Sequence, residues 1–169
     1  MITFNTLWKN FPDKEAIKVR CRNKQPTKST PFENYCATLL SECFIRSGID
    51  LSLLSGDRCW SHQGKRHIIR AEELGNALKK KIPAGFSQPK KIEPGSFQTI
   101  LDEKTGVIYF KDYWRRGKES FAQRSGDHID LWNKDRITSS SMFTRSILEF
   151  LGRVSDLNKS REIWFWEVK

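Results

Sequence analysis

The chain has 169 residues, which is enough to bury a hydrophobic core within one domain without disulfide support. Its formal charge of +10 indicates an anionic partner, such as nucleic acid, a membrane surface or an acidic cell-wall polymer. No apolar run approaches the ~20 residues of a membrane span, and residues 1–30 lack the apolar stretch of a secretory signal. We therefore expect a protein that is made in the cytoplasm and does not insert into a membrane.

The first elements predicted along the chain are a short helix and a loop. Apolar residues from Phe4 to Phe11 recur at three-and-four spacing, and Pro12 ends the pattern. The basic stretch over residues 20–30 contains a proline and is expected to be a surface loop. The alternative for this stretch is a groove wall that attracts an anionic substrate.

Residues 30–48 are predicted to form the helix around which the rest of the chain is organised. Thr30 and Glu33 have the spacing of a capping box, and Pro31 suits the first helical position. Gly48 suits the left-handed residue that follows a helix. Asn34 is a competing cap, and it would start the helix later.

Cys36 lies near the start of this predicted helix and is the candidate nucleophile. Helix amides at an N-terminus favour a thiolate and lower the pKa of a cysteine, which is otherwise roughly 8.5. A helix that begins at Asn34 would place Cys36 in the first turn, where this effect is strongest. The alternative is that Cys36 is a small core residue, like Cys43 on the same apolar stripe.

The other cysteines and the histidines of the first half do not predict a metal site. The four cysteines match no CxxC metal pair and no dense disulfide framework, although a Cys21–Cys59 pairing is left open. His62 and His67 fall in an irregular segment over residues 49–69, with no carboxylate or thiol motif at ligand spacing around them. We interpret both as ordinary loop histidines.

The second half of the chain changes from helical to strand patterns. A helix is predicted over residues 70–81, and a connecting loop over 84–95. Further elements are expected as follows: strands at 107–110, 126–133 and 163–168, and a helix at 142–151. Helices first and strands second predict an α+β fold with an antiparallel sheet, formed by one domain over residues 1–169.

The predicted strand over residues 126–133 carries a candidate base. Alternate side chains share a face of a strand, so His128, Asp130 and Trp132 point the same way. Two strand positions span roughly 7 Å, so a carboxylate and an imidazole there can hydrogen-bond. A cysteine on a helix followed by a histidine on a sheet is the order found in papain-like cysteine amidases.

Two motifs make the chain resemble a known family. NYCATLLSECFIRSG, which contains Cys36, resembles the nucleophile helix of the type VI secretion amidase effectors of family four. GDHIDLWN, which contains His128, resembles their histidine strand, and GVIYFKDYWRR and the aromatic final strand are similar to that family as well. The resemblance implies a papain-like, NlpC-type fold.

The resemblance also implies an activity. Such effectors are cysteine amidases that hydrolyse the amide between D-glutamate and meso-diaminopimelate in peptidoglycan stem peptides of competitor bacteria. They reach the target cell's periplasm through the type VI secretion apparatus, without a signal peptide, and the producer carries a cognate immunity protein. Cys36 would attack the carbonyl and His128 would protonate the leaving amine, so that no metal or organic cofactor is needed.

The third catalytic residue departs from the family's pattern. The family's acid lies beyond the histidine strand, where this chain reads KDRITSSS and has serine at the aligned position. Asp130, on the histidine face, is the preferred substitute. Asp135 is the second choice, and a backbone or serine acceptor is the third.

Two other functions stay open from the sequence. The first is a basic nucleic-acid-binding or nuclease domain that uses tryptophan and arginine side chains as stacking and phosphate contacts. Against it, the lysines and arginines are spread along the whole chain and no recognised binding motif occurs. The second is an inactive relative that only binds cell-wall peptide.

Overall fold

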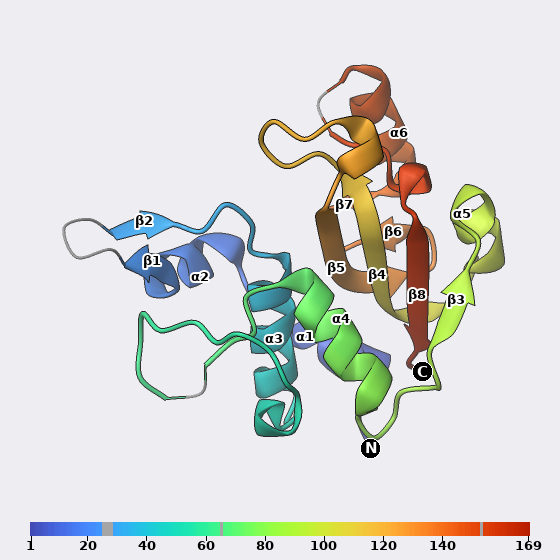
Figure 1. Cartoon of the computed structure of the whole chain (residues 1–169). Coiled ribbons are helices and arrows are strands. Elements are labelled where there is room, and N and C mark those ends of the chain that lie inside the picture. The colour runs from blue at the N-terminus through green and yellow to red at the C-terminus, as the bar shows by residue number, and fades with distance from the viewer. Residues whose placement is uncertain (25–28, 65, 153) are drawn as a thin grey trace. The chain divides into compact units, whose positions relative to one another are not determined.

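The computed structural model describes residues 1–24, 29–64, 66–152 and 154–169. The chain divides into two compact units, Met1–Gly85 and Phe86–Lys169 (Figure 1). The prediction that residues 1–169 form a single domain stays a prediction. No helix within the described ranges is both long and apolar enough to cross a membrane.

The first unit is built around α3 (Cys36–Arg46), which contacts three other helices. These are α1 (Phe4–Asn10), α2 (Lys14–Arg20) and α4 (Ala71–Lys80) (Figure 1). The helices bury apolar side chains, among them Leu7, Ile17, Leu40, Phe44 and Leu74. The predicted helix over residues 70–81 is confirmed as α4.

Two helices replace the single short helix that the sequence predicts at the N-terminus. Thr3 caps α1 through its side chain, and Pro12 follows the end of that helix. The Asp13 side chain then accepts a hydrogen bond from the Ala16 amide at 3.0 Å, and this cap starts α2. The apolar pattern does not reveal α2, because Ile17 is the residue of this helix that is buried.

Two short paired strands lie within the predicted surface loop over residues 20–30. β1 (Arg22–Lys24) pairs with β2 (Ser29–Pro31), with Asn23 opposite Thr30. Residues 25–28 of the predicted loop lie outside the described residues. The sequence does not signal these two strands, because they lack the alternating apolar residues on which strand prediction depends.

The predicted capping box of the nucleophile helix is wrong, because α3 begins at Cys36. Thr30 instead belongs to β2, and Tyr35 occupies the N-cap without a side-chain cap bond. The Tyr35 hydroxyl donates a hydrogen bond to the Cys21 carbonyl oxygen at 2.7 Å and accepts one from the Phe32 amide at 3.0 Å. Cys36 therefore lies in the first helical turn.

The second unit is a six-stranded antiparallel sheet in the order β3-β8-β4-β5-β6-β7 (Figure 1). The strands are β3 (Lys90–Ile92), β4 (Thr105–Trp114), β5 (Gly126–Asn133), β6 (Arg136–Ile137), β7 (Ser140–Ser141) and β8 (Glu162–Glu167). Two helices accompany the sheet: α5 (Phe97–Ile100) and α6 (Met142–Phe150). This unit also contains short 3-10 turns at Pro94–Ser96, Phe121–Gln123 and Leu157–Lys159. In the first unit, a 3-10 turn at Leu51–Leu53 lies between α3 and α4.

Helices in the first unit and an antiparallel sheet in the second confirm the predicted α+β class. The predicted strand over residues 126–133 is β5, and the predicted closing strand is β8. The loop predicted over residues 84–95 is partly wrong, because it contains β3. β3 pairs with β8 at the edge of the sheet, and Lys91 Nζ lies 3.0 Å from Glu162 Oε1 there. Because two of its three residues are lysines, β3 lacks the apolar pattern from which a strand is predicted.

Candidate functional site

His128 and Asp130 are neighbours on one face of β5, as the strand pattern predicts. His128 Nε2 lies 3.1 Å from Asp130 Oδ2. The His128 side chain is 21% exposed, whereas that of Asp130 is 4% exposed. The imidazole therefore reaches solvent while the carboxylate that holds it is buried.

Two further hydrogen bonds hold the Asp130 carboxylate. Its Oδ1 atom accepts hydrogen bonds from the Thr138 hydroxyl at 2.7 Å and from the Leu131 amide at 2.8 Å. These donors compensate the carboxylate for its burial and fix its orientation. Sequence reasoning missed Thr138, although it lies in the KDRITSSS segment to which the family's acid is aligned.

Two aromatic side chains contact the His128 ring. The Phe110 ring is stacked at a centroid distance of 6.3 Å, and the Tyr113 ring meets His128 edge-on at 6.4 Å. Phe110 lies directly opposite His128 in the β4–β5 register. These contacts and the Asp130 carboxylate together restrict the orientation of the imidazole.

The other candidates for the third catalytic residue lie elsewhere. Asp135 is exposed in the turn after β5, and its carbonyl oxygen accepts the Met142 amide at 2.9 Å. Ser141 caps α6 and accepts the Thr144 amide at 3.2 Å. The preferred candidate, Asp130, is thus placed against His128.

Cys36 and Cys43 differ in their surroundings within the first unit. Cys43 is fully buried and donates to the Leu7 carbonyl oxygen at 3.1 Å, as a core cysteine would. Cys36 is half-buried at the start of α3, where the N-cap residue Tyr35 makes no side-chain cap bond. First-turn amides at such a helix start favour a thiolate over a thiol. His128 and Asp130 lie in the second unit, and Cys36 lies in the first.

Four side chains of the first unit form a separate cluster: Cys21, Cys59, His62 and His67. One sulfur or nitrogen atom from each lies within 4.8 Å of those of the other three. Within the described residues no cysteine forms a disulfide bond, and the sulfurs of Cys21 and Cys59 are 3.9 Å apart. The disulfide that the sequence leaves open is therefore absent, and the two thiols share a site with two histidines.

The interpretation of His62 and His67 as ordinary loop histidines is wrong, because it overlooks these thiols. His67 is fully buried, and its Nδ1 atom lies 3.1 Å from the Cys21 sulfur. One signal was available in the sequence, since Cys59 and His62 have the C-x-x-H spacing of a chelating pair. Cys21 could not be found in this way, because it lies far from the other three along the chain.

Glu42 connects this cluster to α3. Its carboxylate lies 2.7 Å from His67 Nε2, 2.6 Å from Arg20 Nη2 and 2.8 Å from Arg46 Nε. Burial alone would raise the pKa of Glu42, but the hydrogen bonds from His67, Arg46 and Arg20 lower that pKa to about 2. Glu42 is therefore an ionised acceptor at neutral pH.

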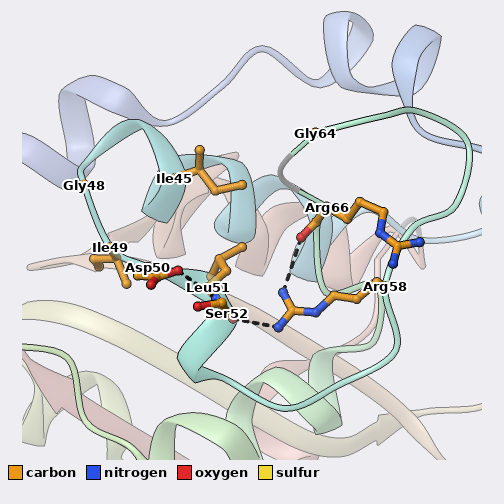
Figure 2. Close-up of a pocket in the computed structure, with 9 residues that line it drawn as sticks. All are labelled: Ile45, Gly48, Ile49, Asp50, Leu51, Ser52, Arg58, Gly64 and Arg66. Carbon is orange, nitrogen blue, oxygen red and sulfur yellow. Dashed lines mark hydrogen bonds between the residues drawn. The ribbon is translucent and has the colours of Figure 1, made fainter.

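A cavity of about 630 Å³ lies between the end of α3 and the segment that follows it (Figure 2). Arg58 spans its wall and donates to the carbonyl oxygens of Leu51 at 2.6 Å and Arg66 at 3.3 Å. Among the described residues that line the cavity, none is a candidate catalytic residue. We therefore assign this cavity no catalytic role.

Solved structures of other proteins share this fold. The type VI effector Tae4 from Enterobacter cloacae matches 100% of this chain over 98% of its own length, with a TM-score of 0.67 and 16% identity. A chain of the type VI effector–immunity complex Tae4–Tai4 from Salmonella Typhimurium matches 100% of this chain over 99% of its length, with a TM-score of 0.64 and 15% identity. These likenesses establish the fold, and they confirm the predicted papain-like, NlpC-type class.

The family follows from the sequence itself. The profile of the family described as type VI secretion system (T6SS), amidase effector protein 4, or Tae4, matches residues 32–166. The chain belongs to this family, so the predicted assignment is confirmed, and the protein is a peptidoglycan amidase toxin of type VI secretion. The nucleic-acid-binding alternative is thereby disfavoured. A comparison with curated proteins finds no match.

Proposed function

We propose that this effector hydrolyses the amide between D-glutamate and meso-diaminopimelate in the peptidoglycan stem peptides of competitor bacteria, with Cys36 as nucleophile. The observation that carries the proposal is the family match over residues 32–166, which includes both Cys36 and His128. Family membership supports the amidase chemistry, and the resemblance of the two motifs supports the choice of bond. The inactive, binding-only alternative is an outcome of the experiment below.

The first half of the reaction acylates Cys36. The thiolate attacks the amide carbonyl carbon, and the oxygen becomes an oxyanion that the Cys36 backbone amide and a second donor stabilise. The carbon–nitrogen bond then breaks, and the leaving amine takes a proton from His128. A thioester joins the D-glutamyl group to Cys36, and the amine product departs.

The second half releases the acyl group. His128, now neutral, accepts a proton from water as the water attacks the thioester carbonyl. The carbon–sulfur bond breaks and restores the Cys36 thiolate and the protonated imidazole. The cycle uses one water molecule per amide and requires no metal or organic cofactor.

Asp130 acts in this scheme as a positioning residue for His128. The Asp130 carboxylate accepts hydrogen bonds from Thr138 and Leu131 at Oδ1, and we assign its Oδ2 atom, 3.1 Å away, as the acceptor of the His128 Nε2 proton. Nδ1 is then the nitrogen that exchanges a proton with Cys36. Catalysis therefore requires Cys36 Sγ to come within hydrogen-bonding reach of this nitrogen.

The biological setting that we propose follows from the same family. The toxin passes through the type VI secretion apparatus and acts in the periplasm of the target cell. The structures from Salmonella Typhimurium and Enterobacter cloacae include effector–immunity complexes, and we propose a cognate immunity protein for this effector as well. Its formal charge of +10 suits attraction to an anionic cell wall.

The choice of bond is tested by mass spectrometry of purified Gram-negative peptidoglycan after incubation with the protein. New fragments that carry a free diaminopimelate amine and a D-glutamyl carboxylate would support the proposal. Cleavage at another amide would overturn the choice of bond while leaving the amidase class intact. Binding of muropeptides without any cleavage would instead support a binding-only relative.

A further inference from the structure

The Cys21, Cys59, His62 and His67 cluster has the ligand set of a metal site that lies apart from the candidate catalytic residues. Three of its four side chains are fully buried, and His62 is half-buried. Thiolates and imidazoles are the ligands that Zn²⁺ prefers, and four of them make the closed coordination sphere of a structural zinc site. The geometry points to a structural Zn²⁺ site formed by Cys21 Sγ, Cys59 Sγ, His62 Nε2 and His67 Nδ1.

The distances among the four ligand atoms fit a tetrahedron around Zn²⁺. Bonds of about 2.3 Å to sulfur and about 2.0–2.1 Å to nitrogen require edges of about 3.8 Å between sulfurs, about 3.3 Å between nitrogens and about 3.6 Å between sulfur and nitrogen. The sulfurs here are 3.9 Å apart and the two nitrogens 3.3 Å apart. The four sulfur–nitrogen distances run from 2.8 to 3.8 Å. Five of the six distances lie within about 0.5 Å of these edges, and the sixth, 2.8 Å between Cys59 Sγ and His62 Nε2, is shorter. The four atoms therefore surround one point at close to tetrahedral spacing.

In each histidine, the nitrogen that is not a proposed ligand is held by a hydrogen-bond acceptor. That bond turns the other nitrogen toward the centre of the cluster. His62 Nδ1 lies 2.9 Å from the Gln63 carbonyl oxygen, which only accepts, so the proton of His62 sits on Nδ1. His67 Nε2 lies 2.7 Å from a Glu42 carboxylate oxygen, so we assign the proton of His67 to Nε2 and leave Nδ1 to face the two sulfurs. Backbone carbonyls and carboxylates are the usual partners of zinc-bound histidines.

This pattern places two nitrogen lone pairs 3.3 Å apart and facing each other. Each nitrogen also lies close to a cysteine sulfur: His62 Nε2 is 2.8 Å from Cys59, and His67 Nδ1 is 3.1 Å from Cys21. A bound Zn²⁺ would accept both lone pairs together with the two thiolates. Arg20 Nη2 also lies 3.0 Å from His67 Nε2, and arginine only donates. Glu42 is the closer partner of that nitrogen and itself accepts from Arg20 at 2.6 Å, so we assign the Nε2 proton to the Glu42 bond.

The backbone brings the ligands together from two segments. Cys21 follows the end of α2, and the other three ligands come from the segment between α3 and α4. A bridge between Arg58 and Ile68 closes that segment, and the Cys59 amide donates to the His67 carbonyl oxygen at 2.9 Å. The Arg58 guanidinium adds a bond to the Arg66 carbonyl oxygen (Figure 2). The ion would therefore tie α2 to this segment.

Two contacts link the proposed zinc site to the nucleophile helix. Glu42 on α3 accepts from His67, and the Tyr35 hydroxyl donates to the Cys21 carbonyl oxygen at 2.7 Å. Tyr35 immediately precedes Cys36. Zinc therefore supports the start of α3 without contacting the substrate, and its loss lowers stability directly and amidase activity only through the fold.

The site is tested on the full chain by metal analysis and by cobalt substitution. Purified wild type should contain about one zinc ion per chain. After zinc is removed with a chelator, Co²⁺ should give the visible bands of a tetrahedral thiolate site, and added Zn²⁺ should abolish them. Neither reading depends on amidase activity, so a failed proposal for the reaction leaves this test intact.

A comparison of ligand variants with a control variant outside the cluster tests which residues bind the ion. His62→Ala removes the half-buried ligand, and we expect it to lower the zinc content and the Co²⁺ bands by at least tenfold at equal metal concentration. Cys43→Ala removes a buried cysteine outside the cluster and should retain both. A fold check by circular dichroism accompanies each variant, and Cys59→Ser provides a second ligand change.

Three results would overturn the proposal. The first is wild-type protein that binds neither Zn²⁺ nor Co²⁺ after reduction. The second is a zinc content that is equal in wild type, His62→Ala and Cys59→Ser. The third is a Cys21–Cys59 disulfide in metal-free wild type that persists in the active protein, as seen by mass spectrometry without reductant.

Discussion

His128 Nε2 lies 3.1 Å from Asp130 Oδ2. The two side chains share one face of β5, with Asp130 two residues after His128. The family's pattern places the acid later in the sequence, where this chain has serine. A carboxylate from a different position thus contacts the imidazole. We therefore propose that Asp130 takes the place of that acid in orienting His128.

Replacing Asp130 by asparagine should lower kcat by roughly 10²–10⁴-fold and leave KM nearly unchanged. The amide of asparagine can donate to His128 Nε2, which would favour the wrong tautomer. Steady-state hydrolysis of a defined stem peptide measures the effect, and Asp135→Asn is the matched control with near wild-type activity. If Asp135→Asn proved the more damaging change, the assignment of Asp130 would be wrong.

Thr138 should act as a positioning residue for Asp130. Thr138→Val removes the 2.7 Å bond to Asp130 Oδ1, and we expect kcat to fall about tenfold with little change in KM. Thr138→Ser keeps the hydroxyl and should restore most of kcat. Thermal unfolding of both variants separates this role from stability, and equal activity in Thr138→Val and wild type would refute it.

Cys36 should react with iodoacetamide before Cys43 in the native protein. Cys36 is half-buried at a helix start, whereas Cys43 is fully buried and bonded to the Leu7 carbonyl oxygen. Peptide mapping after brief labelling gives the order. The rapid adduct should disappear in Cys36→Ala and remain in Cys43→Ala, and preferential labelling of Cys43 would contradict the account.

Tyr35→Phe should destabilise the protein by about 1–2 kcal/mol, because its hydroxyl joins the Cys21 carbonyl oxygen to the Phe32 amide. Denaturant unfolding measures the change. Zinc content should stay at the wild-type level, since the hydroxyl bonds the backbone of Cys21 and not its sulfur. A variant as stable as wild type would show that these bonds contribute nothing net.

The sequence predicted those elements whose side chains carry a periodic pattern. β5, β8, α4 and α6 have such patterns, and the structure confirms them. Three features were missed: α2, β3 and the β1–β2 pair. α2 starts at a side-chain cap, β3 depends on its pairing at the sheet edge, and β1 and β2 consist mainly of polar residues. None of these leaves an apolar period in the sequence.

The same distinction applies to the functional residues. The contact between His128 and Asp130 could be predicted, because two positions on a strand share a face whatever the rest of the fold does. The start of α3 was placed wrongly, because Thr30 satisfies a capping pattern and a strand equally well. The Cys21 cluster depends on contacts between distant segments, and only the Cys59–His62 spacing hinted at it.

If Cys36 is the nucleophile of this peptidoglycan amidase, the release of stem peptides depends on its thiol. A comparison of wild type with Cys36→Ala measures that dependence. Purified Gram-negative peptidoglycan is incubated with each folded protein, with Cys43→Ala as control. The account predicts soluble stem-peptide fragments from wild type and Cys43→Ala, and at least a thousandfold lower rate from Cys36→Ala. Release by Cys36→Ala at the wild-type rate would contradict it.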